Sequence, residues 1–258
     1  MTVLMRAVAD PAEELLWLSR RPQEDAITGY DAEDWEASTW VLHAMYENRS
    51  LRADVTHHAW RQDRIARGVD EPTVINGANL DETTIVTGGH LGYVARPGAA
   101  WQRLGWRQYA DRIGWPLNSD QPTPPCHRWF PTASWPVAIM PPPEGSLDEA
   151  SLTALLTTLA THSDRRNDTQ CYAFYASLAS GDFDRTTLLA GPLSAIGELV
   201  VGDAAFMSTP SNLWPEDRSW FVWTDWDLWA TKLSGSRALI AAVQKHPDLE
   251  TIAWPERT

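Results

Sequence analysis

Two acidic residues and an arginine stand side by side in the segment PEDR, residues 215–218. A neighbouring carboxylate raises the pKa of a carboxyl group and an arginine lowers it, so Glu216, Asp217 and Arg218 could support acid–base chemistry or bind a polar ligand. The same residues suit an ion pair or an Asx turn that fixes a loop, and this structural interpretation is favoured. No second carboxylate at a diagnostic spacing indicates a glycosidase.

Histidines offer a second kind of chemistry. His90 follows two glycines in the segment TGGH, where a glycine turn could cradle a phosphate and the imidazole could act as a base. No lysine and no helix start follow, so a hairpin turn is favoured over a phosphate loop. His57 and His58 would point about 100° apart on a helix, which predicts a solvated basic face rather than a metal site. Cys126 and His127 are sequence neighbours, an arrangement that rarely supports a nucleophilic cysteine.

Five tryptophans fall between residues 214 and 229, in the segment WPEDRSWFVWTDWDLW. In SWFVW both alternating sets of side chains are apolar, which is typical of a strand covered on both faces. Trp220, Trp223 and Trp229 are therefore expected in the core. Trp214 precedes a proline and Trp226 stands at a turn, so these two remain candidates for ligand binding.

The turn TDWD, residues 224–227, predicts a hairpin. In the expected register Trp223 faces Leu228 and Val222 faces Trp229. Trp223 and Phe221 share one face of this hairpin, and Trp220, Val222 and Trp229 share the other. One of the two faces is expected to pack on the helix that follows Ser236.

The first third of the chain has the pattern of helices. Residues 10–22 begin with Asp10 and Pro11, residues 31–48 repeat apolar side chains at helical spacing, and residues 56–68 run from a threonine cap to Gly68. Residues 83–95 predict a hairpin around two glycines, and residues 101–115 predict a short helix.

Residues 116–143 hold nine of the 18 prolines, so they cannot form a helix. Trp129, Phe130 and Trp135 are too apolar for a solvated linker, which predicts an ordered strap or a seam between a first region, residues 1–115, and a second, residues 144–258. We expect a strand at 136–140, near the end of the strap, and, in the second region, a strand at 171–178 and capped helices at 145–162 and after Ser236. The predicted fold class is α+β: a helical N-terminal region, then a mixed, largely antiparallel sheet with flanking helices.

The net charge of −13 argues against nucleic acid, because a phosphate-binding surface needs clustered lysine and arginine. It also argues against anionic membranes, and no run of 18 apolar residues predicts a membrane span. A basic protein partner or a small polar ligand remains compatible with the charge. The chain has no cofactor or metal motif and only two cysteines, Cys126 and Cys171, whose pairing the sequence leaves open; a cytoplasmic protein is expected.

The segments WEASTWVLHAMYE, GSLDEASL and SNLWPEDRSWFVWTDWDLWATKLSGSRALI resemble a family of uncharacterised actinobacterial proteins of unknown function. The resemblance runs along most of the chain and is most specific from LWPEDRSWFV to GSRALI. It implies no activity and assigns no catalytic residue.

Two hypotheses follow. The first is a non-catalytic binding or interaction protein, one version being an immunity-type protein whose acidic charge steers a basic partner. The alternative is an enzyme that acts on a small polar molecule in a tryptophan-walled cleft near PEDR or His90. A deep cleft with converging ionisable groups would favour the enzyme.

Overall fold

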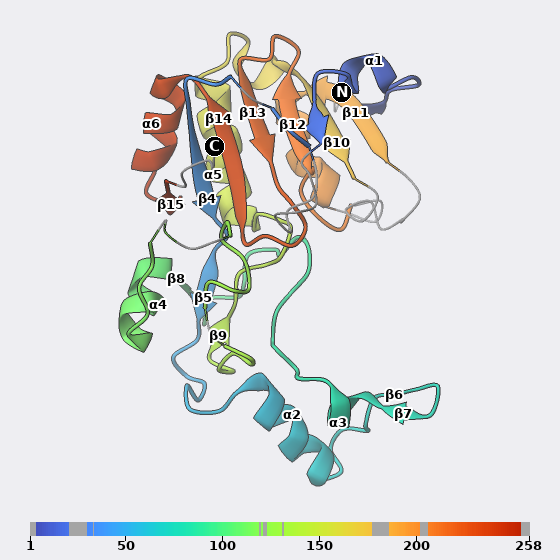
Figure 1. The fold of residues 1–258 in the computed structure, drawn as a ribbon, viewed down its shortest axis with the longest axis vertical. Helices are drawn as coiled ribbons and strands as arrows, with labels where there is room; N and C mark the ends of the chain where they lie inside the picture. Colours follow the sequence, from blue (N-terminus) through green and yellow to red (C-terminus); the bar gives the residue numbers. More distant parts are fainter. Residues whose placement is uncertain are drawn as a thin grey trace.

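A large antiparallel sheet dominates the molecule, as the computed structural model shows (Figure 1). The structure describes residues 4–20, 30–32, 34–118, 120, 123–130, 132–176, 186–201 and 206–253. Every pairing between neighbouring strands of this eight-stranded sheet is antiparallel. In spatial order the strands are β1 (Arg6–Ala7), β11 (Thr187–Pro192), β10 (Gln170–Tyr175), β12 (Asn212–Pro215), β13 (Trp220–Trp223), β14 (Ala230–Gly235), β4 (Ala37–Leu42) and β15 (Thr251–Ile252).

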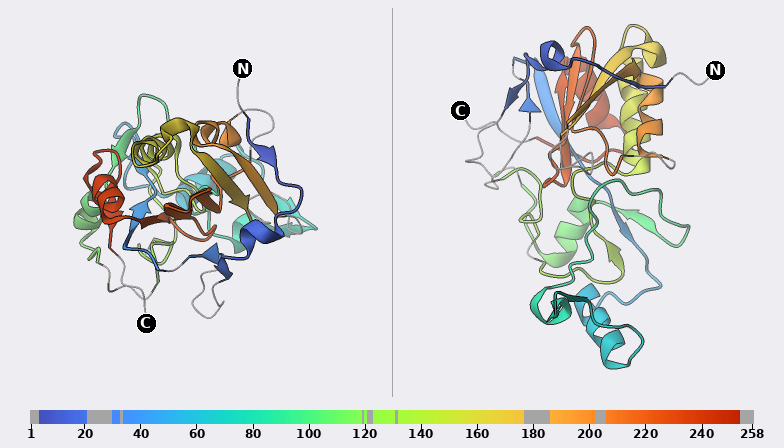
Figure 2. Two further views of the ribbon diagram at one scale, coloured as in Figure 1. Left: turned by 90° about the horizontal axis from the view of Figure 1, so that it is seen from above. Right: turned by 90° about the vertical axis from the view of Figure 1, so that its right-hand side faces the viewer.

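Two helices cover one face of this sheet (Figure 2). The helix α5 (Glu149–Thr161) is capped by Asp148, and α6 (Arg237–Lys245) is capped by Ser236, each through a side-chain oxygen that accepts a backbone N–H. Their leucines pack against the sheet residues Trp220, Val222 and Leu233. The expectation that one face of the hairpin packs on the helix after Ser236 is confirmed, and the structure shows that this face carries Trp220 and Val222.

Aromatic side chains cover the opposite face. Trp40 and Trp223 meet there with ring centroids 5.5 Å apart, and Trp17 lies edge-on to Trp214 and Phe221. The segment that supplies Trp17 holds α1 (Ala12–Leu15), β2 (Ser19–Arg20) and β3 (Tyr30–Asp31). On this face the ammonium of Lys232 is buried with the carboxylate of Asp31, 2.8 Å away.

Strand β13 alternates as expected, but its register differs. Trp220 and Val222 face the helices, whereas Phe221 and Trp223 face the aromatic side, and all four are buried. Trp223 pairs with Lys232 rather than with Leu228, a shift of four residues. Because the shift is an even number of residues, the side chains of both strands stay on the faces of the sheet where they were expected. The exception is Trp229, which leaves the sheet and packs between Trp106 and Trp135 on the aromatic side.

A second, three-stranded sheet lies below the first (Figure 1). Its strands are β8 (Gln102–Leu104), β5 (Met45–Glu47) and β9 (Ile139–Met140), with α4 (Trp106–Ile113) beside them. Between β5 and β8 the chain makes a long excursion, residues 49–98, here called the lobe. It contains α2 (His57–Ala66), β6 (Val74–Ile75), β7 (Ala78–Asn79) and α3 (Leu80–Thr83). Three 3-10 helices, Arg166–Asp168, Leu193–Ala195 and Gly197–Val200, complete the described elements.

The predicted helical N-terminal region is wrong. Residues 37–42 and 45–47, expected in one helix, are strands β4 and β5, and the helix expected at 10–22 is the single turn α1. The fold is mostly β, with helices distributed along the chain. Strand β4 lies between β14 and β15 and is buried on both faces, so its apolar run lacks the alternation that marks a half-exposed strand.

Two other expectations differ in detail. Residues 83–95 do not form the expected hairpin; after α3 their one β-bridge within the described residues is a parallel one between Leu91 and Glu144. Strand β8 occupies the start of the helix expected at 101–115, because residues 102–104 pair with β5. The helix at 56–68 is confirmed as α2, with Thr56 as its cap and Gly68 at a φ of 68°. Trp129, Phe130 and Trp135 of the proline-rich segment are buried as expected.

His43 stands between β4 and β5, at the point where the chain passes from the large sheet to the small one. Its backbone N–H donates to the carbonyl of Trp229 (2.8 Å), and its carbonyl accepts from the indole of Trp106 (2.8 Å). In the ring, Nδ1 donates to the carbonyl of Pro143 (2.7 Å), so Nε2 is the acceptor for the Thr231 hydroxyl, 3.0 Å away. In the neutral imidazole, Nδ1 therefore carries the proton, and both ring nitrogens have a hydrogen-bond partner.

Trp223→Ala should destabilise the protein by about 3–5 kcal/mol, because Trp223 is a large, fully buried side chain. Trp226→Ala should cost much less, since Trp226 is only half-buried in the loop after β13. Urea denaturation of both variants measures the difference. Equal losses would contradict the core role of Trp223.

The stability of the protein should fall as the pH drops from about 6.5 to about 4. Burial lowers the pKa of His43 to about 4 from 6.5, so below 6.5 the unfolded chain binds a proton that the folded chain does not. The full effect is about 3 kcal/mol. Urea denaturation across this pH range should show a shallower slope for His43→Gln than for the unmodified protein. An identical slope would show that His43 does not contribute.

Candidate functional site

The residues of the PEDR segment form the turn between β12 and β13. Glu216, Asp217 and Arg218 are exposed. Asp217 Oδ1 accepts the backbone N–H of Ser219 at 3.0 Å, and Arg218 adopts a φ of 53° with its guanidinium 4.8 Å from the ring centroid of Trp17. These contacts match the structural interpretation of an Asx turn, here with a cation–π contact in place of an ion pair.

The same turn borders a shallow polar cleft of about 300 Å³. Glu216 and Asp217 line it together with Asp164, Arg165, Thr169 and Gln170. Three carboxylates face one arginine here, and the cleft is open to solvent. It offers no apolar wall, so it differs from the tryptophan-walled cleft of the enzyme hypothesis.

Trp214 and Trp226 lie at different places in the fold. Trp214 is fully buried in β12 and stacks on Tyr172 at 5.6 Å. Trp226 follows the last residue of β13, whereas Glu216 and Asp217 precede its first residue, so the length of the strand separates them, roughly 13 Å at about 3.3 Å per residue. The structure therefore does not bring the candidate residues of this stretch together.

His90 lies in the lobe, on the extended segment after α3. The residue is exposed, and partial burial of its ring, with His57 nearby, lowers its pKa below the ordinary value. It borders an apolar cavity with Trp60 and Trp101. His90 is thus the one candidate that lies beside a tryptophan-lined cavity, and that cavity is far more apolar than a site for a small polar substrate.

One cluster of ionisable groups was not anticipated from the sequence. Three loops meet where Gly145 N–H donates to Leu228 O and Trp229 N–H donates to Pro125 O, at 2.9 and 2.8 Å. They bring Glu144 and Asp227 near each other and near His127. Burial raises the pKa of both carboxyl groups, and His127 partly opposes it. The residues are far apart in the chain, so no spacing rule could have found this cluster.

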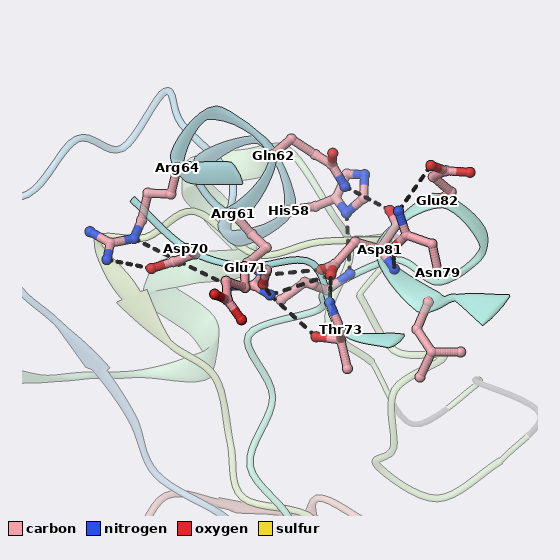
Figure 3. Close-up of polar contacts among 12 residues, drawn as sticks. His58, Arg61, Gln62, Arg64, Asp70, Glu71, Thr73, Asn79, Asp81 and Glu82 are labelled. Atoms are coloured by element: carbon pink, nitrogen blue, oxygen red, sulfur yellow. Dashed lines mark hydrogen bonds and ion pairs between the residues drawn. The ribbon is translucent and has the colours of Figure 1, made fainter. Parts of the chain in front are cut away.

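The lobe is held together by ion pairs (Figure 3). Arg61 of α2 binds both oxygens of the buried Asp81, at 3.1 and 3.3 Å, and also reaches Asp70 at 2.9 Å and the carbonyl of Glu71 at 2.8 Å. Asp81 in turn accepts the backbone N–H of Thr73 at 2.6 Å. One guanidinium therefore joins α2, the segment 70–73 that leads into β6, and α3.

Arg64 adds a second clamp to the same network. Its guanidinium binds both oxygens of Asp70, at 2.8 and 2.6 Å. Pairing with Arg64, and then with Arg61, lowers the pKa of Asp70 to about 2, so this carboxylate stays ionised and paired at any higher pH. No residue of α2 is buried, so polar contacts replace a hydrophobic core here.

The proline-rich segment ties the lobe to the small sheet. His57 N–H donates to the carbonyl of Trp135, and the amide of Trp135 donates to the carbonyl of Thr87, at 2.8 and 2.9 Å. The hydroxyl of Ser134 donates to Val86 O at 2.7 Å and accepts the backbone N–H of His58 at 3.0 Å. Residues 134 and 135 thus hold the start of α2 and the segment after α3 beside each other.

The lobe also presents apolar side chains to solvent. Within the described ranges, twelve large hydrophobic residues are exposed, and seven of them fall in these 50 residues of a 258-residue chain. The seven are Leu51, Trp60, Val69, Val74, Ile75, Ile85 and Leu91. Both residues of β6 belong to this set. The β6–β7 hairpin therefore exposes apolar side chains, whereas a hairpin surrounded by water usually exposes polar ones.

In the described part of the chain, no group of three or more histidine, cysteine, aspartate or glutamate side chains could hold a metal ion. Cys126 and Cys171 are buried free thiols. No described helix is both long enough and apolar enough to span a bilayer.

Comparison of the chain with protein-family models, curated proteins and solved structures finds no match. The resemblance to a family of actinobacterial proteins stays a prediction.

Arg61→Ala should loosen the β6–β7 hairpin and α3, because Asp81 and Asp70 would lose their shared partner. We expect amide hydrogen exchange at Thr73 and Thr84 to speed up by about tenfold or more, with exchange in the large sheet unchanged. Arg67→Ala is the matched control, since Arg67 pairs with Asp63 on the exposed side of the same helix. Similar exchange in both variants would contradict the clamp role of Arg61.

Proposed function

We propose that this protein is a non-catalytic binding protein that contacts a protein partner through the apolar surface of the lobe. The observation that carries the proposal is the concentration of exposed apolar residues in the lobe, including Trp60, Val74 and Ile75. Exposed apolar patches on folded chains mark interaction sites, because burying them on a partner recovers their hydrophobic free energy.

The ionic frame of the lobe supports this proposal. Arg61, Arg64, Asp70 and Asp81 bind one another, so the backbone that carries the apolar residues has a defined conformation before any partner arrives. A preorganised surface loses less conformational entropy on binding than a disordered one.

The lobe and the rest of the chain differ in net charge. Of the chain's 21 basic and 34 acidic residues, six of each lie in the lobe, so the net charge of −13 belongs to the rest of the chain. A partner with an apolar patch and basic residues beside it fits both surfaces. An immunity-type role towards a basic protein is one version of this proposal, and a cytoplasmic location, compatible with the two free thiols, is part of it.

The enzyme hypothesis has less support. Glu216, Asp217 and Arg218 are accounted for by the turn they form, and Trp226 and His90 lie elsewhere. A binding role requires none of these residues to converge.

The experiment compares three immobilised proteins in a lysate of the source organism, with bound proteins identified by mass spectrometry. The lobe variant is Val74→Ser with Ile75→Ser. The control is Leu4→Ser with Val201→Ser, which removes two apolar side chains of similar exposure outside the lobe. A partner should be retained by the unmodified protein and the control, and depleted about tenfold on the lobe variant.

The effect of salt distinguishes binding through the apolar lobe from binding through the acidic surface. Binding through the lobe should persist in 0.5 M salt, whereas contacts made only by the acidic surface should weaken. A partner retained equally by the lobe variant, or lost completely in salt, would contradict the proposal.

A further inference from the structure

An apolar cavity lies between the start of α2, the segment after α3 and strand β9. Its volume is about 300 Å³, at the small end of ligand pockets, which span roughly 300–1,000 Å³. The aromatic side chains that line it are Trp60 and Trp101, and its aliphatic lining includes Ile139 and Met140. A ligand of this cavity is therefore small and mostly apolar.

His57 and His90 are the only titratable side chains that line the cavity; the other lining residues are uncharged. His57 Nε2 lies 3.4 Å from the carbonyl of Ile139, which makes Nε2 the donor and leaves Nδ1 as the acceptor of a neutral ring. His90 interacts electrostatically with His57, and its pKa is lowered by partial burial and then by that neighbour. Two imidazole groups therefore lie in one site that is otherwise apolar.

The backbone is shaped to bring the two histidines together. Gly88 adopts a φ of 84°, and a Cβ on this residue would collide with the imidazole of His57. The glycine lets the segment that carries His90 lie directly against the start of α2. Trp135, whose carbonyl accepts the backbone N–H of His57 at 2.8 Å, fixes this end of the helix.

We propose that this cavity binds a small planar aromatic acid, with its ring against Trp60 and Trp101 and its carboxylate at His57 and His90. Indole faces suit a flat ring, and imidazoles that take up a proton provide the matching charge for a carboxylate. A cationic head group does not fit, because no acidic side chain lines the cavity. The site does not depend on the protein partner proposed above, although Trp60 belongs to both.

The probes are naphthalene-1-carboxylate and its neutral amide, naphthalene-1-carboxamide, each titrated into the full-length protein by calorimetry at pH 7.5 and pH 6.0. The carboxylate should bind about three- to tenfold more tightly at pH 6.0, because a bound carboxylate would raise the pKa of His90 and binding would take up a proton. The amide should bind with an affinity that does not change between the two pH values.

Variants separate the two parts of the site. His90→Gln should reduce the pH dependence of carboxylate binding and leave amide binding unchanged, whereas Trp101→Ala should weaken both ligands at least about fivefold. His162→Gln, a change at an exposed histidine outside the cavity, should behave as the unmodified protein. The proposal is overturned if neither ligand binds at millimolar concentration, if carboxylate and amide bind alike at both pH values, or if binding survives Trp101→Ala unchanged.

Discussion

The buried imidazole of His43 joins the two sheets, because it stands where one continuous chain leaves β4 and enters β5. Its ring bonds Pro143 and Thr231, and Thr231 is also 2.8 Å from Thr224, so the junction reaches the loop after β13. Trp229 accepts the His43 amide and packs its indole on Trp106 and Trp135. Hydrogen bonds set the geometry of this junction, and the aromatic rings around it exclude the water that would compete with them.

Different forces stabilise the different layers of the molecule. Leucines from two capped helices cover one face of the large sheet, and indole rings cover the other, where the Lys232–Asp31 pair is buried. In the lobe, guanidinium groups replace apolar packing. Arg61 and its carboxylates connect the elements of the lobe, while apolar side chains such as Val74 and Ile75 face solvent. The lobe holds six basic and six acidic residues, so the net negative charge lies in the rest of the chain.

Only part of the candidate site can be predicted from the sequence. The two glycines before His90 mark it as a candidate, and it lies beside the cavity, but no sequence pattern links Trp60 and Trp101 to it. In PEDR two carboxylates and an arginine are sequence neighbours, and the same proximity lets Asp217 and Arg218 stabilise a turn. Glu144 and Asp227 were missed because 82 intervening residues separate them and only loop packing brings them near each other.

The sequence by itself determined the local features: the caps of α2 and α6, the two-sided burial of β13, and the order of the proline-rich segment around Trp129 and Trp135. Caps and alternation depend on neighbours within a few residues, so they can be read locally. Only the tertiary structure decided that residues 37–42 are a strand, because β14 and β15 supply the hydrogen bonds on its two sides. It also decided the register of β13 with β14. The backbone N–H of Trp229 donates to Pro125 and its indole packs on Trp106, so Trp229 does not pair with β13.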